Sequence, residues 1–138
     1  MWSIFFLLSG YGYEGEVLYY LDSKGQVIGL LKRKTAWYVI LRAIREKASS
    51  ALAAFKKDPS MPASTQAQKV EKRLREIKEW LGFSEEYLEQ WIKLGNDFMN
   101  WVHKKFHNDE MDNQRGVFPS IWKTYLSETQ KSDKIDWN

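Results

Sequence analysis

The sequence contains no cysteine. Disulfide bonds, thiolate metal sites and thiol catalysis are therefore excluded, and an intracellular setting, cytoplasmic or nuclear, is expected. A long apolar run is also missing, because the apolar stretch within residues 1–10 is far too short to span a bilayer. No basic region precedes that stretch, so we expect an extra strand or non-homologous sequence there, with a secretory signal as the alternative. We expect no membrane partner.

The overall composition is that of a chain able to fold. Its 138 residues are enough for one domain, and contents of 43% hydrophobic and 15% aromatic residues are enough to bury a core. The formal net charge of +3 and the pI near 9.0 permit nucleic-acid binding without requiring it. A monomer is expected.

Two short apolar runs near the start of the chain are separated by a turn sequence. Asp22-Ser23-Lys24-Gly25 combines a residue that starts turns with a glycine that tolerates positive φ. Residues 17–21 and 27–31 are therefore predicted to be the arms of a β-hairpin. Neither face of the first arm is fully polar, so we expect one face to pack on a helix.

The second arm leads into a lysine pair. Side chains alternate in an extended chain, so Lys32 and Lys34 should point to one side and Arg33 to the other. Two ammonium groups then converge on one spot, an arrangement suited to a phosphate. Apolar residues follow at helical spacing from Trp37 to residue 55, with Thr35 placed to cap that helix.

These residues resemble a known family. The run Glu14-Gly15-Glu16-Val17, then Lys32-Arg33-Lys34, then Trp37-Tyr38-Val39, is similar to the fourth and fifth nucleotidyltransferase motifs of ATP-dependent RNA ligases of the bacteriophage single-strand type. The resemblance covers residues 14–54. Enzymes of this family join a 3′-hydroxyl to a 5′-phosphate of RNA ends through a lysyl-adenylate and then an adenylated RNA end, as in RNA repair.

The resemblance implies roles for three residues, which are the expected catalytic and nucleotide-binding set. Glu14 would lie near the divalent metal and the nucleotide, acting on Mg²⁺ indirectly through its hydration shell. Lys32 and Lys34 would contact the phosphate of ATP or of the bound adenylate. The implied cofactors are ATP and Mg²⁺, and the implied partners are RNA ends.

The chain departs from the family at the nucleophile. The family uses a lysine in a Lys-x-Asp-Gly or Lys-x-Asn-Gly setting, and no such tetrapeptide occurs in the sequence. No other group at the site can replace that amine in attack on the α-phosphorus. We therefore expect residues 1–56 to be the C-terminal fragment of a ligase nucleotidyltransferase domain, inactive alone, from a partial gene product or a degenerate paralogue.

A second interpretation is a non-catalytic helical module that binds RNA or a protein partner. Each ligase motif is short and common, and a charged strand end is usually only solvated surface.

In either case residues 57–138 are expected to form a helical domain, which makes the fold class α+β: a short N-terminal β-hairpin followed by about four helices. The expected features of this half, in order, are a loop over residues 57–64, a helix over 65–81 ended by Gly82, a helix capped by Ser84 and running to about 107, a short helix from Pro119, and a frayed polar end from Thr129.

Two further groups of side chains could bind ligands. Arg42, Arg45 and Lys47 could extend a basic surface toward RNA, although a solvated helix face is the simpler interpretation. His103 and His107 have metal-ligand spacing with acidic residues nearby. Because the glutamate of an H-E-x-x-H motif is absent and lysines lie between them, a solvated pair is expected.

Overall fold

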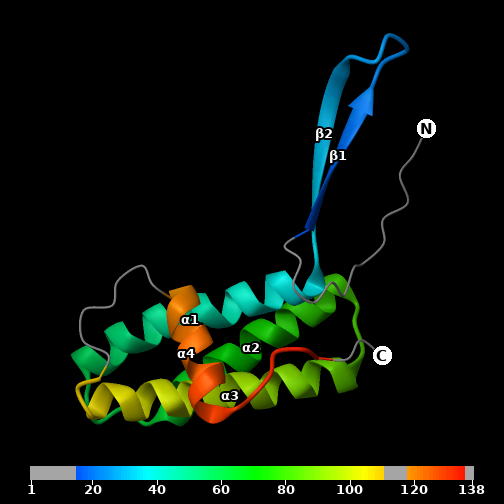
Figure 1. Cartoon of the computed structure of the whole chain (residues 1–138). Helices are drawn as coiled ribbons and strands as arrows, with labels where there is room; N and C mark the ends of the chain where they lie inside the picture. Colours follow the sequence, from blue (N-terminus) through cyan, green and yellow to red (C-terminus); the bar gives the residue numbers. More distant parts are fainter. Residues whose placement is uncertain (1–14, 111–117, 136–138) are drawn as a thin grey trace. The chain divides into compact units, whose positions relative to one another are not determined.

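The chain has an α+β fold in which a two-stranded antiparallel hairpin precedes four helices (Figure 1). The computed structural model describes residues 15–110 and 118–135. The described elements are β1 (Gly15–Leu21), β2 (Val27–Lys34), α1 (Ala36–Lys57), α2 (Ala63–Leu81), α3 (Glu85–His107) and α4 (Phe118–Thr129). The predicted fold class is confirmed.

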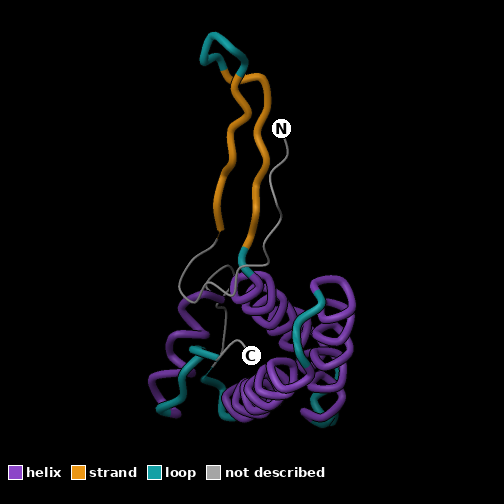
Figure 2. Tube along the Cα trace, turned by 90° about the vertical axis from the view of Figure 1, so that its right-hand side faces the viewer, coloured by secondary structure: helices purple, strands orange, loops and turns teal. Residues whose placement is uncertain are grey.

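The hairpin is closed by the predicted turn. Asp22 Oδ1 accepts hydrogen bonds from the backbone N–H of Lys24 at 2.8 Å and of Gln26 at 2.9 Å. Gly25 has φ +79°, a left-handed conformation that costs glycine nothing. Figure 2 shows the two strands running side by side and joined by this loop. The local chemistry of the turn therefore selects the hairpin that the sequence predicts.

The distal half of the hairpin differs from the prediction. A register shift between Tyr20 and Leu21 leaves Ile28 as an extra residue in β2, and such a β-bulge bends and twists the strand. The exposed fractions of large apolar side chains there are 61% for Tyr19, 54% for Leu21, 57% for Val27 and 70% for Ile28. These four side chains are therefore largely exposed, and the expectation that one face of the first arm packs on a helix stays a prediction.

The chain divides into two compact units, and the boundary falls after Val39. The sequence predicts the boundary after residue 56. The difference arises because α1 is continuous, and its apolar stripe is buried from Ile40 through Ile44 to Phe55. Most of α1 therefore belongs with the helical unit.

The ends of the helices follow from local sequence. Thr35 Oγ1 accepts the Tyr38 N–H at 3.1 Å, and Ser84 Oγ accepts the Tyr87 N–H at 3.1 Å. Both contacts are side-chain N-caps. Gly82, with φ +76°, ends α2 and donates its N–H to the Lys78 carbonyl at 2.7 Å. All three predicted cap residues are confirmed.

The core of the helical unit lies where α1, α2 and α3 come together. The helices α2 and α3 run side by side (Figure 1). A Cβ added to Gly95 of α3 would lie 2.9 Å from Val70 Cγ1 of α2 and 3.8 Å from Ile44 Cδ1 of α1. Ile44, Val70 and Gly95, one residue from each of the three helices, thus lie close together. A methyl group at position 95 would fit only if a neighbouring side chain moved.

Helix α4 is attached to α3 by aromatic packing and by a polar network. Trp122 packs edge-to-face on Phe98 with 4.9 Å between ring centroids. The Tyr125 hydroxyl donates to Asp97 Oδ2 at 2.7 Å, and Lys131 Nζ lies 2.6 Å from the same oxygen. Burial opposes the ionisation of Asp97, but the hydrogen bonds from Lys131 and Tyr125 outweigh it and lower the pKa of this carboxyl. The carboxylate is therefore the acceptor that both donors share.

The segment after α4 is ordered by a buried hydrogen bond. Trp122 Nε1 donates to Asp133 Oδ2 at 2.9 Å, and the Asp133 side chain is only 7% exposed. The predicted frayed end from Thr129 is therefore wrong as far as residue 133. The prediction failed because the polar sequence of this segment suggested exposure to solvent, whereas the Asp133 carboxylate is buried and accepts a hydrogen bond from Trp122.

Candidate functional site

The predicted site lies where β2 passes into α1. The strand ends at Lys34, the buried Thr35 links the two elements, and the helix begins at Ala36. Lys34 is exposed, and its ammonium group lies 5.8 Å from the centroid of the Tyr38 ring, within range of a cation–π contact. The Thr35 cap holds the backbone N–H of Tyr38, so this ring comes from the capped first turn of α1. The expected strand-to-helix junction is present.

The strand register distinguishes the arginine from the two lysines. Arg33 pairs with Glu16 across the hairpin, so positions of opposite charge stand directly opposite one another. Lys32 pairs with Val17, and Lys34 pairs with Gly15. Within the described part of β1, Arg33 is therefore the residue opposite an acidic position, whereas both lysines are opposite neutral residues.

The three predicted site residues are placed to different extents. The backbone of Lys32 is located by its register, and Lys34 is located together with its side chain. Glu14 lies outside the described residues. Within residues 15–110 and 118–135, no three histidine or acidic side chains are grouped so as to hold a metal ion. What the described junction offers is a lysine ammonium accessible to an anionic ligand.

The two histidines of α3 lie close together, and His103 contacts other parts of the helical unit. His103 Nε2 lies 3.1 Å from the Met61 carbonyl oxygen, and its ring packs edge-on against Phe55 at 4.9 Å. The His107 ring lies 4.5 Å from that of His103. The expectation of a solvated pair is wrong for His103, which is half-buried and joins the end of α1 and the α1–α2 loop to α3.

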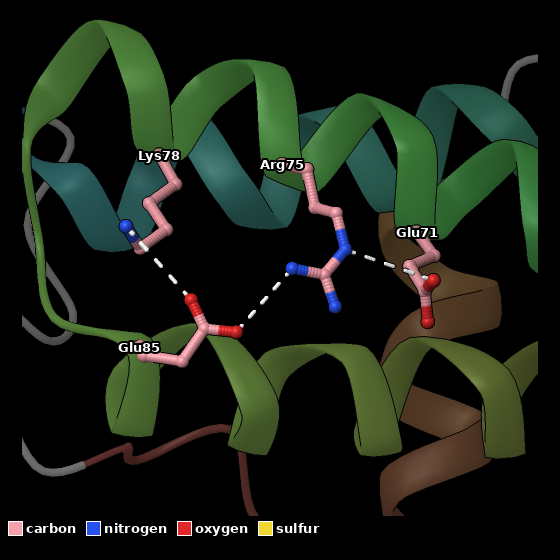
Figure 3. Close-up of polar contacts among 4 residues, drawn as sticks. All are labelled: Glu71, Arg75, Lys78 and Glu85. Carbon is pink, nitrogen blue, oxygen red and sulfur yellow. Dashed lines mark hydrogen bonds and ion pairs between the residues drawn. The ribbon is translucent and has the colours of Figure 1, made fainter.

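Cations on α2 are matched by carboxylates along the seam with α3, as Figure 3 shows. Arg75 Nε lies 3.7 Å from Glu71 Oε2, and Arg75 Nη1 lies 3.3 Å from Glu85 Oε1. Lys78 Nζ lies 3.8 Å from the other oxygen of Glu85. Such exposed pairs contribute little to stability. They do neutralise the seam, which is therefore not a basic surface.

The basic residues of α1 are also partly engaged. Arg42 Nε lies 2.9 Å from Glu46 Oε1, one turn further along the helix. Arg45 and Lys47 are half-buried rather than fully solvated. The predicted extension of a basic surface over these three residues is thereby weakened, since one charge is paired and the other two are partly covered.

The apolar stripe predicted for α2 does not include Trp80, and the structure places this residue at the surface. Trp80 is 74% exposed, whereas Val70, Leu74 and Ile77 of the same helix are buried as predicted. The signal for it was present in the sequence, because Trp80 falls outside the helical spacing of the buried stripe.

Comparison with protein-family models, with curated proteins and with solved structures finds no match to this chain. None of the helices in the described ranges is both long enough and apolar enough to cross a bilayer.

Proposed function

We propose that this chain is the C-terminal part of an ATP-dependent RNA ligase, containing part of the nucleotide pocket and the helical region that follows. The observation that carries the proposal is the strand register. It sets Lys32 and Lys34 at positions opposite neutral residues and sets Arg33 opposite Glu16. In this proposal the two lysines bind a phosphate. The substrate of the protein is an intracellular RNA.

The chemistry of the junction is suited to a phosphate. An exposed ammonium is a mobile point charge with three donors, and Lys34 holds one at the end of β2. The Tyr38 ring offers that ammonium a cation–π contact, which leaves its charge in place. ATP would supply the adenylyl group, and Mg²⁺ would neutralise part of the phosphate charge. The lysines would hold the phosphate and orient it.

Replacing the lysines should weaken phosphate binding. A hydrogen bond to a charged group contributes about 1.5–3 kcal/mol, so Lys32→Ala or Lys34→Ala should weaken the binding of ATP or of 5′-phosphorylated RNA by about one to two orders of magnitude. Arg33→Ala is the matched control on the same strand and should have a much smaller effect. Isothermal titration of the whole chain measures all three. An Arg33→Ala loss equal to the lysine losses, or no loss in any variant, would refute the shared phosphate site.

The isolated chain should form no covalent adenylate. The expected reason is the missing Lys-x-Asp-Gly or Lys-x-Asn-Gly nucleophile, without which no amine is set to attack the α-phosphorus. The protein is incubated with Mg²⁺ and ATP labelled at the α-phosphate and is then denatured and run on a gel. An intact ligase incubated in parallel shows that the assay detects an adenylate. A labelled band from this chain that survives heat and detergent would contradict the prediction.

A non-catalytic helical module is the second candidate function. It is favoured by the helical unit having its own buried core, in which Ile44, Leu88 and Phe98 are each 0% exposed. This unit needs no nucleotide chemistry to fold, and its use would be to bind RNA or a protein partner.

A further inference from the structure

An exposed tryptophan lies on the outer face of α2. Trp80 is 74% exposed, and among the tryptophans that the structure describes it is the exposed one. Burial of a large aromatic ring usually stabilises a fold, and Trp91 and Trp122 are almost fully buried here. Trp80 therefore contributes little to the core and leaves an indole available for stacking.

Exposed cations share this part of the helix. Lys69, Arg73, Glu76 and Trp80 are spaced four, three and four residues apart, which places them on one stripe, and Lys72 flanks it. All five residues are exposed. At a rise of 1.5 Å per residue the stripe is about 16 Å long. A chain-like ligand could therefore contact several of these groups at once.

The stripe keeps a positive charge after its internal pairing is counted. Arg73 Nη1 lies 3.2 Å from Glu76 Oε2, and both side chains are about half exposed, at 50% and 52%. Such a surface pair is weak, so Arg73 can exchange partners. Within the described residues, Lys69 and Lys72 make no ion pair. This differs from the seam in Figure 3, where Arg75 lies between two carboxylates and Lys78 lies beside one.

We propose that this stripe of α2, through Lys69, Arg73 and Trp80 and the flanking Lys72, binds single-stranded nucleic acid. A base stacks on the indole, and the cations, which all precede Trp80 along α2, contact the phosphates on one side of that base. Proteins that bind single strands without sequence preference combine these two features, an aromatic platform and a positive track. The polyanion is favoured over a protein partner by charge complementarity, because the stripe carries the three exposed cations Lys69, Lys72 and Arg73 against the one carboxylate of Glu76. The proposal rests on the second candidate function, for which it names the binding surface of the helical module. It does not depend on Lys32 or Lys34.

The test measures binding of the full chain to a labelled oligouridine without a 5′-phosphate, so that the lysine pair is not probed. Fluorescence anisotropy should show Trp80→Ala weakening binding by about tenfold or more, because stacking is lost. Trp80→Phe should retain most of the binding, since a ring remains. Glu76→Gln should tighten binding, because a carboxylate is removed from the track. Lys123→Ala, which removes an exposed cation from α4, is the control and should change binding little.

The salt dependence separates phosphate contacts from stacking. Lys69→Ala and Lys72→Ala should each reduce the slope of log K against log salt by about 0.7, whereas Trp80→Ala should leave the slope unchanged. Oligothymidine should bind as oligouridine does, since a base face and phosphates are common to both, and a blunt duplex should bind more weakly. Unchanged binding in Trp80→Ala, equal binding of the duplex, or no single-strand binding at all would overturn the proposal. None of these results bears on the ATP titrations of the lysine variants.

Discussion

Ile44→Asp is expected to destabilise the helical unit severely at neutral pH. Ile44 is 0% exposed and lies at the point where α1 meets Gly95 of α3. An ionised carboxylate there would lose its hydration without gaining a partner, at a cost of about 4 kcal/mol or more. Because the total stability of a domain is only about 5–15 kcal/mol, a large part of it would be lost.

Urea denaturation followed by circular dichroism measures this effect. The midpoint should fall by about 2 M or more, using a slope typical of small domains. Ser49→Asp introduces the same charge at an exposed position of α1 and should change the midpoint little. Because only the charged form is strongly disfavoured, the deficit of Ile44→Asp should shrink as the pH falls below the raised pKa of the buried carboxyl. Equal midpoints for the two variants would show that position 44 is not in the core.

Trp122→Ala should release α4 and the segment after it. The Trp122 side chain is 1% exposed, packs on Phe98 and donates a hydrogen bond to Asp133. Removal of a buried tryptophan side chain costs about 3–5 kcal/mol through lost transfer energy and the remaining cavity. The urea midpoint should fall, and amides of α4 should lose protection from hydrogen exchange.

The chain provides a matched control for this variant. Trp80→Ala is the same substitution at an exposed position and should change stability by no more than about 0.5 kcal/mol. Trp122→Phe keeps most of the apolar volume but removes the hydrogen bond to Asp133, and should cost about 1–3 kcal/mol. Equal costs at positions 80 and 122 would show that α4 is not docked as described.

The features that could be predicted from the sequence are those whose cause lies within four residues. Asp22 and Gly25 specify the turn of the hairpin, and Thr35 and Ser84 specify the starts of α1 and α3. Each of these residues acts on backbone groups of its own segment. No knowledge of the tertiary fold is needed to predict them.

The features that could not be predicted depend on contacts between distant segments. His103 meets the Met61 carbonyl, 42 residues earlier in the chain, and no periodicity connects the two. Asp133 resembles a solvated tail residue until Trp122 is placed beside it by the packing of α4. Burial of a polar residue is decided by its partner, and the partner is not in the local sequence.

The candidate site follows the same division. Period-2 alternation predicts that Lys32 and Lys34 differ from Arg33, and this depends only on the local strand. The register, which sets Glu16 opposite Arg33, depends on the bulge at Ile28 as well as on the turn, and no sequence pattern indicates the bulge.

The close approach at Gly95 restricts which sequences can adopt this fold. A Cβ there would lie 2.9 Å from Val70 Cγ1, and valine is branched at Cβ and cannot easily rotate away. Positions 70 and 95 are therefore expected to change together during evolution. A relative with alanine at position 95 should carry a smaller residue at position 70, and the double variant Val70→Ala with Gly95→Ala should be tolerated better than Gly95→Ala alone.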